Sequence, residues 1–179
     1  HIENGDGERT ALIWEGNDSS ENKFYSYNEL LKEVNKFSNV LKSLGAKKGD
    51  RVCLYMQMIP ELAIAMLACA RIGAIHSIVF GAFSSDSLRD RINDSKCKFL
   101  ITQDTGIRGQ KLDIPMKSNA NKALDETPSI KSVIVVKRTN YEVSMTNGRD
   151  HWWDVLMSEA NANCKPESMN AEDPLFILY

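Results

Sequence analysis

Apolar and polar residues alternate in blocks along the first part of the chain. Thr10 to Trp14 (T-A-L-I-W) is typical of a strand, and the polar run from Glu15 to Asn22 closes it. Ser26 and Glu29 then have the spacing of a capping box, in which each side chain satisfies a free amide of the first helical turn. Apolar residues follow at helical spacing: Leu30, Leu31, Val34, Phe37, Val40, Leu41 and Leu44. The pattern predicts an amphipathic helix that ends at Gly45, a natural terminator.

Beyond this helix, short apolar runs alternate with helical patterns. The expected strands are Arg51 to Met56, Ala74 to Phe80, Lys98 to Thr102 and Ser132 to Val136. The expected helices run from Pro60 to Ile72, from a cap at Ser84 or Ser85 through the inward-facing Leu88 and Ile92, and from Asn119 to Leu124. Strands that alternate with helices at this spacing predict an α/β fold, a layered and mainly parallel sheet with flanking helices. We expect one domain over residues 1–179.

The last part of the chain carries weaker patterns. Residues 139–150 are polar and rich in turn formers, which favours a surface excursion. His151 to Ser158 is expected to form a short helix in which Trp152 and Trp153 are packing residues.

The chain ends on the apolar run Leu175 to Tyr179 (L-F-I-L-Y), which follows the helix-breaking Asp173-Pro174 and is typical of a buried strand. An unpaired apolar strand at a terminus invites aggregation. We therefore expect the single domain to be incomplete and the polypeptide to continue beyond Tyr179.

Composition narrows the class of protein. The chain is 42% apolar and 26% charged, with a formal net charge of -2. This balance is ordinary for a globular domain and does not call for nucleic acid or a membrane surface as a partner. The nearly apolar stretch from Leu62 to Phe80 is interrupted by Arg71, Gly73 and His76, so a buried helix and strand fit it better than a membrane span.

The four cysteines are Cys53, Cys69, Cys97 and Cys164. They form no C-x-x-C pair, no histidine lies at metal-finger spacing, and three of them sit in apolar periodic segments. The pattern predicts free buried thiols in a reducing, cytoplasmic compartment, and no metal site.

No standard catalytic or phosphate-binding motif is present. The chain contains no G-x-G-x-x-G after a strand, no G-x-x-x-x-G-K-[ST] and no G-x-S-x-G. His76 lies within an apolar strand, which favours a hydrogen-bonded core histidine over a catalytic one. We therefore expect no catalytic residue in these 179 residues.

Two segments have the composition of a ligand site. In Ile107 to Lys111 (I-R-G-Q-K), Arg108 and Lys111 flank a flexible centre just after an expected strand end, where open α/β sheets bind ligands. An arginine fork and a lysine point charge suit a phosphorylated cofactor. A solvated surface turn is the alternative.

The second segment is Phe80-Gly81-Ala82-Phe83, also at an expected strand end. Small residues there let the backbone approach a ligand, and a flanking aromatic ring can stack on a base. The alternative is a tight turn between strand and helix with two core aromatics.

Nearly the whole chain resembles the acetyl-CoA synthetases, a branch of the adenylate-forming superfamily that also holds acyl-CoA ligases and luciferases. The resemblance lies in runs that keep the family's order and spacing. They are E-R-T-A-L-I-W-E-G, Tyr25 to Met56 with its K-K-G-D-R-V turn, Ile59 to Ile92 with A-R-I-G-A-I-H-S-I-V-F-G-A-F-S, I-R-G-Q-K, G-R-D-H-W-W-D-V-L and N-A-E-D-P-L-F-I-L-Y. The phrases V-F-G-A-F-S and N-A-E-D-P-L-F-I-L-Y are specific to the acetate branch.

The resemblance implies a two-step ligase. Acetate attacks the α-phosphorus of ATP with Mg²⁺ present, and acetyl-adenylate and pyrophosphate form. The CoA thiol then takes the acetyl group and releases AMP. The small-molecule substrates implied are acetate, ATP and CoA.

The resemblance also assigns roles to the two candidate segments. Arg108 and Lys111 would contact the phosphates of the CoA nucleotide, with Gly109 and Gln110 between them, and Phe80, Gly81 and Ala82 would lie against its adenine. The family often has a second glycine where Ala82 and Gln110 stand. Ala82 is a small change, whereas Gln110 is a candidate to restrict or re-aim the loop.

In the family, a Thr/Ser/Gly-rich ATP loop begins directly after the position of Tyr179, and the Mg²⁺ ligand, the acetate pocket and the C-terminal domain come later. The resemblance therefore implies an N-proximal segment that is inactive by itself. Two other functions stay open: a propionyl- or other short-chain acyl-CoA synthetase, and a non-catalytic nucleotide-binding α/β scaffold.

Overall fold

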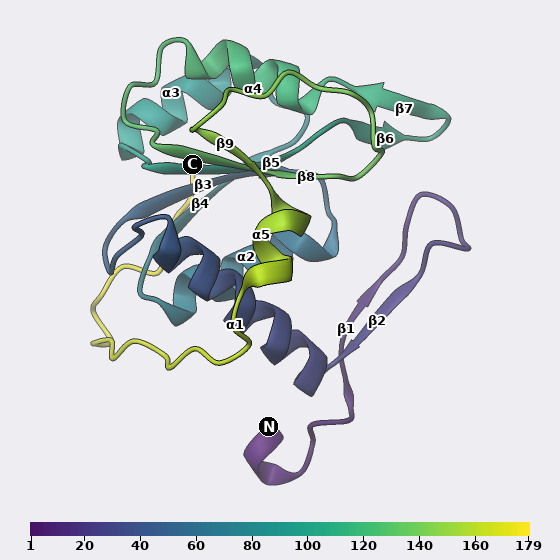
Figure 1. The fold of residues 1–179 in the computed structure, drawn as a ribbon, viewed down its shortest axis with the longest axis vertical. Coiled ribbons are helices and arrows are strands. Elements are labelled where there is room, and N and C mark those ends of the chain that lie inside the picture. Colours follow the sequence, from purple (N-terminus) through teal and green to yellow (C-terminus); the bar gives the residue numbers. More distant parts are fainter.

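A sheet of six parallel strands forms the centre of the molecule in the computed structural model, which describes residues 1–179 (Figure 1). Its strand order is β10-β4-β3-β5-β8-β9. The strands are β3 (Arg51–Met56), β4 (Ile75–Phe80), β5 (Phe99–Gln103), β8 (Ser132–Val136), β9 (Asp150–Trp152) and β10 (Phe176–Ile177). All five strand pairs are parallel, so the predicted mainly parallel α/β sheet is confirmed.

Helices cover both faces of the sheet (Figure 1). On one face lie α1 (Tyr27–Ser43), α2 (Pro60–Arg71) and α5 (Trp153–Glu159), and on the other lie α3 (Ser85–Ser95) and α4 (Met116–Leu124). Successive residues of β3 alternate between the two layers: Val52 and Leu54 belong to the core under α1 and α2, and Cys53 to the core under α3 and α4. Burial on both faces explains why the central strands are nearly continuous apolar runs.

Local signals set the helix ends. The capping box predicted at Ser26 is present, since the Ser26 hydroxyl accepts from the Glu29 amide at 3.2 Å and the Ser26 amide donates to the Glu29 carboxylate at 2.8 Å. Pro60 occupies the first position of α2, and Ser84 caps α3 through the Ser87 amide. Gly45 follows α1 with φ 91°, a left-handed conformation that favours glycine.

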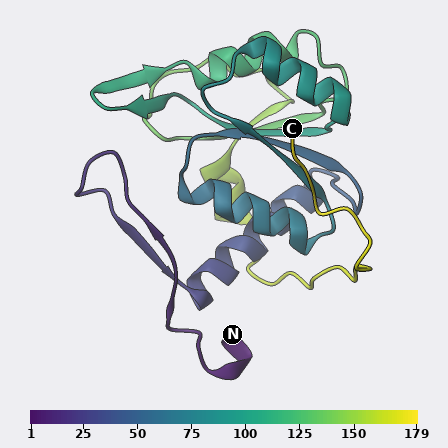
Figure 2. The same cartoon turned by 180° about the vertical axis from the view of Figure 1, so that it is seen from behind.

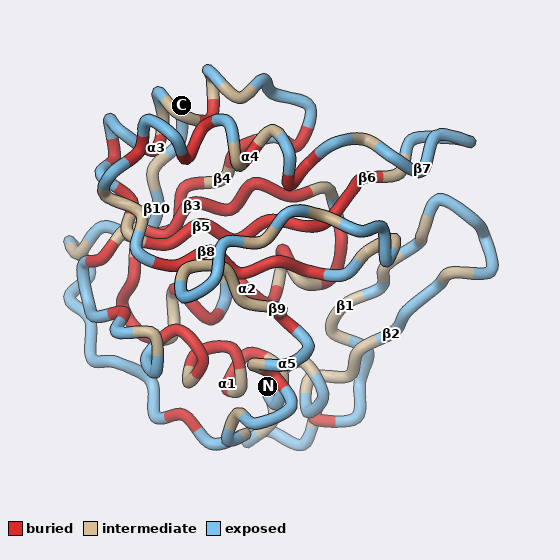
Figure 3. The backbone as a smooth tube through the Cα atoms, turned by 45° about the horizontal axis from the view of Figure 1, so that its top comes forward, coloured by how far each residue is buried: buried red, intermediate tan, exposed pale blue.

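Two hairpins lie outside the main sheet, and of their four strands only Thr10–Trp14 was predicted, with its correct bounds. One pairs β1 (Thr10–Trp14) with β2 (Lys23–Ser26), and the other pairs β6 (Gly106–Arg108) with β7 (Lys111–Ile114). Both extend from the same side of the molecule, and apart from Gly106 the residues of their strands are exposed or intermediate in burial (Figure 3). Near the N-terminus a single 3₁₀ turn, Ile2–Asn4, precedes them.

The region from 139 to 158 differs from its prediction. A short strand, β9, pairs with β8 before α5 begins at Trp153, so the helix expected from His151 starts two residues later. Trp153 does pack in the core, where its ring stacks on Phe37 with 3.9 Å between centroids. The surface excursion ends on Asp150, whose side chain is fully buried.

The prediction of a buried strand at the C-terminus is wrong. Only Phe176–Ile177 pairs with β4, and Leu175, Phe176, Leu178 and Tyr179 are each more than half exposed. The preceding segment runs along the outside of α1 and α2 (Figure 2). It is held there by hydrogen bonds such as Asn35 Nδ2 to Ala162 O and Arg71 Nε to Cys164 O, both 2.9 Å. Apolar composition alone therefore did not determine burial here.

All four cysteines are buried with free thiols, as predicted, although only three of them lie in apolar periodic segments. None of the helices combines the length and the apolar character that crossing a bilayer requires. No group of three His, Cys, Asp or Glu side chains is placed to hold a metal ion.

Candidate functional site

A cavity of about 700 Å³ opens where β3 and β4 end, beside the β6–β7 hairpin. Its lining comes from the β1–β2 hairpin, the residues that follow β3, β4 and β8, and the β6–β7 hairpin: Trp14, Glu15, Asn17, Gln57, Met58, Ile59, Phe80, Gly81, Ala82, Ile107, Arg108, Lys111, Ile114 and Arg138. The carboxyl edge of a parallel sheet is where open α/β folds bind ligands. The volume lies within the range usual for small-molecule sites.

Both segments predicted from sequence meet in this cavity. Phe80, Gly81 and Ala82 line it from the end of β4, and Arg108 and Lys111 line it from the β6–β7 hairpin. The remaining predicted residues, Gly109 and Gln110, form the exposed tip of that hairpin and are not part of the lining.

The segment after β4 presents an aromatic ring beside closely packed backbone. Phe80 is 61% exposed and Phe83 is 39% exposed, with their rings edge to face at 6.0 Å, so they are not core aromatics. A Cβ on Gly81 would lie 3.1 Å from the Met56 carbonyl oxygen and 3.0 Å from Met116 Cε. A side chain at Gly81 would therefore require the end of β3 or the Met116 side chain to shift by a few tenths of an ångström.

The β6–β7 hairpin places two cations side by side. Arg108 and Lys111 are paired residues of the two strands and flank the turn. Gly109 supplies the one left-handed position of the turn, at φ 58°. Gln110 has no positive φ, so a side chain there does not strain the turn. The backbone therefore gives no reason to expect that glutamine in place of glycine restricts the loop.

Arg138 is a third cation at the cavity that the sequence did not single out. Its guanidinium lies over the Trp14 ring, 5.3 Å from the centroid, and donates to the Glu21 carboxylate at 2.6 Å. Trp14 is in turn anchored by its indole N–H, which donates to the Met58 carbonyl at 2.7 Å. The lining contains two further cations, Arg108 and Lys111, and one acidic residue, Glu15. The cavity therefore carries an excess of positive charge.

A buried carboxylate holds the chain next to Arg138. Asp104 has no exposed surface and accepts hydrogen bonds from the backbone amides of Arg138, Thr139 and Asn140, at 2.8–3.2 Å. It follows β5, so it joins the ends of β5 and β8 and fixes the direction in which Arg138 leaves β8. No sequence motif marked this residue.

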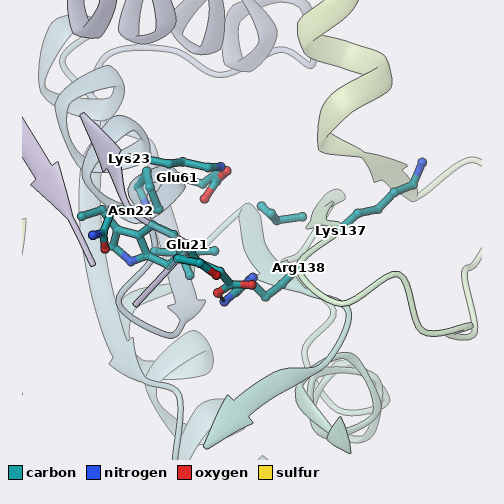
Figure 4. Close-up of a pocket in the computed structure, with 11 residues that line it drawn as sticks. Glu21, Asn22, Lys23, Glu61, Lys137 and Arg138 are labelled. Carbon is teal, nitrogen blue, oxygen red and sulfur yellow. Dashed lines mark hydrogen bonds and ion pairs between the residues drawn. The ribbon is translucent and has the colours of Figure 1, made fainter. Parts of the chain in front are cut away.

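A second, smaller pocket of about 380 Å³ adjoins the first (Figure 4). The two share Trp14, Ile59 and Arg138, which therefore form the wall between them. Glu21 and Arg138 point toward one another in Figure 4, whereas the Lys137 ammonium points away. The lining of this smaller pocket mixes both signs of charge, so the pocket has no clear preference for an anion or a cation.

His76 differs from its prediction. It is buried, at 6% exposed, as expected for a core residue, but its Nδ1 has no hydrogen-bond partner. Burial lowers the pKa of its imidazole below the ordinary value of 6.5. His76 lies on β4 at the register position of Phe176 on β10, away from the cavity lining.

The lining of the cavity has groups suited to binding a phosphorylated ligand with a flat ring. Arginine and lysine at its rim fit phosphate groups, and an exposed phenylalanine beside glycine backbone fits a flat ring. The lining contains no histidine, cysteine or serine, so it has no nucleophile–base pair of the usual kinds.

Comparisons with known proteins agree along nearly the entire chain. The family model described as AMP-binding enzyme matches residues 2–179. An acetyl-coenzyme A synthetase of Rubrobacter xylanophilus is 58% identical over 178 residues, which is 99% of this chain and 28% of that protein. Acetyl-coenzyme A synthetase 2 of Pseudomonas putida is 56% identical over 173 residues, or 97% of this chain and 27% of that protein. The chain thus spans just over a quarter of the length of the relatives it matches.

Proposed function

Because this chain belongs to the AMP-binding enzyme family, we propose that it is part of an enzyme that activates acetate with ATP and passes the acetyl group to CoA. The products are acetyl-CoA, AMP and pyrophosphate. The proposal concerns the complete enzyme, since the chain spans 27 to 28% of the length of the two relatives compared. The names of these two relatives support acetate, rather than a longer acid, as the substrate.

The chemistry consists of two displacements. A carboxylate oxygen of acetate attacks the ATP α-phosphorus, the bond to the β-phosphate oxygen breaks, and pyrophosphate leaves. The CoA thiol, having lost its proton, then attacks the acetyl carbonyl, and AMP leaves with the bonding electrons. Charge neutralisation and positioning dominate such reactions, and Mg²⁺ supplies part of the neutralisation when it is bound.

For this chain we infer a role in binding the CoA nucleotide. Arg108 and Lys111 would neutralise its phosphates, and Phe80, Gly81 and Ala82 would lie against its adenine. Gly109 and Gln110 would form the turn that carries the two cations. One observation carries the proposal. The segments at Phe80 and at Arg108, about 30 residues apart and each predicted from its composition to bind a ligand, line a single cavity with excess positive charge.

The groups that act on ATP, Mg²⁺ and acetate are assigned to other parts of the enzyme. We assign no catalytic or metal-binding role to any residue of this chain. We also propose that residues 1–179 form part of a larger N-terminal domain. We expect the isolated segment to show no acetate-dependent pyrophosphate exchange above background. The free buried thiols support a reducing, cytoplasmic compartment.

The test is the variant Arg108→Ser in the complete enzyme. Loss of a charge-assisted hydrogen bond should raise the KM for CoA about ten- to a hundredfold. Acetate-dependent pyrophosphate exchange, which needs no CoA, should stay within about twofold. The matched control is Arg9→Ser, which removes an arginine that is 74% exposed, pairs only with Asp6 and lies outside the cavity lining.

If Arg108→Ser lowers both half-reactions equally, the assignment of Arg108 to CoA is wrong. If the KM for CoA does not change, the cavity is not the CoA site.

A further inference from the structure

Two side-chain amides hold the backbone on either side of Arg108. Asn17 donates from Nδ2 to the Gly109 carbonyl at 2.8 Å, and its Oδ1 accepts from the Gly109 amide at 3.1 Å. Gln57 donates from Nε2 to the Ile107 carbonyl at 3.0 Å, and its Oε1 accepts from the Ile107 amide at 2.8 Å. Each amide therefore satisfies both backbone groups of one neighbour of Arg108, as an adjacent strand would.

The two amides come from parts of the chain that are remote in sequence. Asn17 is in the loop of the β1–β2 hairpin, 92 residues from Gly109, and Gln57 directly follows β3, 50 residues from Ile107. Both side chains line the same cavity as Arg108. The segment from Ile107 to Gly109 is thus hydrogen-bonded by side chains from two different loops at the rim of the cavity.

The backbone of Gln57 is itself held in place. Its backbone N–H donates to Gln103 Oε1 at 2.8 Å, and Gln103, fully buried at the end of β5, also donates to the Thr105 carbonyl at 2.9 Å. Gly106 leaves room for the Gln57 side chain, since a Cβ there would lie 2.8 Å from the Gln57 amide carbon. Glycine at 106 is therefore explained by this contact.

The physical need for such support follows from the hairpin. An isolated two-stranded hairpin is marginally stable in water. β6 and β7 form such a pair, with strands of three and four residues, and Arg108 and Lys111 are exposed at its end. Without external support the guanidinium would sample many positions, and a ligand would have to bear the entropy of ordering it.

We propose that Asn17 and Gln57 are positioning residues that pre-order Arg108 for an anionic nucleotide ligand. The proposal rests on the CoA site proposed above and assigns to the β1–β2 hairpin a part in it. Neither residue needs to touch the ligand. They act by holding Ile107 and Gly109, and so the backbone from which the arginine projects.

The primary test is Asn17→Ala in the complete enzyme, because Asn17 is exposed and its loss should leave folding intact. Removing two hydrogen bonds to the loop should raise the KM for CoA about three- to tenfold. The value of kcat and acetate-dependent pyrophosphate exchange should stay within about twofold. Gln57→Met, which keeps the length of the side chain and removes its amide, should act in the same direction.

The matched control is Asn39→Ala. Asn39 is half-buried and also ties two carbonyls, those of Asn161 and Asn163, at 2.8 and 2.9 Å, but it lies on α1 away from the cavity. Its loss should leave the KM for CoA unchanged. A rise equal to that of Asn17→Ala would mean that loss of any such tether has this effect, and the positioning role would be overturned.

A double variant separates positioning from independent binding. If Asn17 acts through Arg108, then Asn17→Ala with Arg108→Ser should bind CoA no worse than Arg108→Ser alone, to within about twofold. Effects that multiply would show that Asn17 works independently, and the proposal would fail.

The same set of variants distinguishes the two proposals. If Arg108→Ser leaves the KM for CoA unchanged, the CoA site is wrong and the inference falls with it. If Arg108→Ser raises the KM and Asn17→Ala does not, the site stands and only the positioning role is refuted.

Discussion

The Lys117 ammonium lies 2.7 Å from Oδ2 of Asp150, and neither side chain has any exposed surface. The lysine also donates to the Ser144 carbonyl at 2.9 Å, and the carboxylate accepts from Arg149 Nε at 2.6 Å. Burial lowers the pKa of the Lys117 amine. Burial alone would raise the pKa of the Asp150 carboxyl, but hydrogen bonds from Arg149 and Lys117 outweigh it and lower that pKa. The pair joins α4 to β9 across the otherwise polar 139–150 excursion.

Breaking this pair should destabilise the protein strongly. In Lys117→Met, Asp150 stays buried and keeps only Arg149 as a counter-charge, and removing one partner from such a buried pair typically costs about 3–5 kcal/mol. The measurement is the free energy of unfolding in denaturant. The control is Lys137→Met, because the ion pair of Lys137 with Asp154 at 2.8 Å is partly exposed, and such pairs contribute about 1 kcal/mol or less. Equal losses in the two variants would contradict the assigned importance of the buried pair.

Removal of the cap of α1 should have a moderate effect. In Ser26→Ala the Glu29 amide loses its acceptor, which should lower the free energy of unfolding by about 1 kcal/mol. Ser20→Ala provides the comparison, because Ser20 is exposed and bonds only to Asp18 within its own loop. A similar loss in both variants would show that the capping box contributes little.

Stability should fall on mild acidification because of His76. Its folded pKa lies below the ordinary 6.5, so the unfolded chain binds a proton more readily than the native one. The contribution is therefore zero well above pH 6.5 and turns unfavourable as the pH falls through that value toward the folded pKa, by at most about 1.4 kcal/mol per pH unit. When the free energy of unfolding is measured in denaturant from pH 8 to 5, it should fall less steeply with decreasing pH in His76→Leu than in the unmodified protein. A slope as steep as that of the unmodified protein would assign the acid sensitivity to other groups.

A methyl group at Gly106 should disturb the candidate site by displacing the Gln57 side chain. In Gly106→Ala the new Cβ would meet the Gln57 amide at about 2.8 Å, so the amide must move away from Ile107. We expect a loss of about 1–2 kcal/mol in unfolding free energy and a rise of about three- to tenfold in the KM for CoA. Steady-state kinetics of the complete enzyme measures the second effect.

The comparison for that variant is Gly5→Ala. Gly5 has φ 90° with open space around its missing Cβ, so alanine there costs backbone strain without contact. We expect some loss of stability and an unchanged KM for CoA. If both variants raise the KM equally, the contact between Gly106 and Gln57 does not control the site.

Long periodic segments were predicted from the sequence with nearly correct bounds. The helix after Ser26 and the one that begins at Pro60 carry their own capping signals, and the strands around Leu54 and Ile134 are apolar on both faces. Such features depend on a few neighbours along the chain or on burial from both sides, and both leave a pattern in the sequence.

The short strand β9 was missed because its stability comes from partners that are not its neighbours along the chain. β9 is three residues long and includes the charged Asp150, which is buried only because Lys117 meets it from α4. At the apolar end of the chain the prediction was wrong in the opposite sense, because burial was expected. Phe176 pairs with β4 yet stays half exposed.

By itself the sequence determined the class of fold, the family and the cations and small residues at two strand ends, because residue type and local spacing carry that information. Only the tertiary structure decided that Phe80 and Arg108 share a cavity, that Arg138 joins them, and that Asn17 and Gln57 hold the backbone beside Arg108. Those relationships depend on which loops meet at one edge of a parallel sheet. Strand order brings them together, and no short stretch of sequence specifies that order.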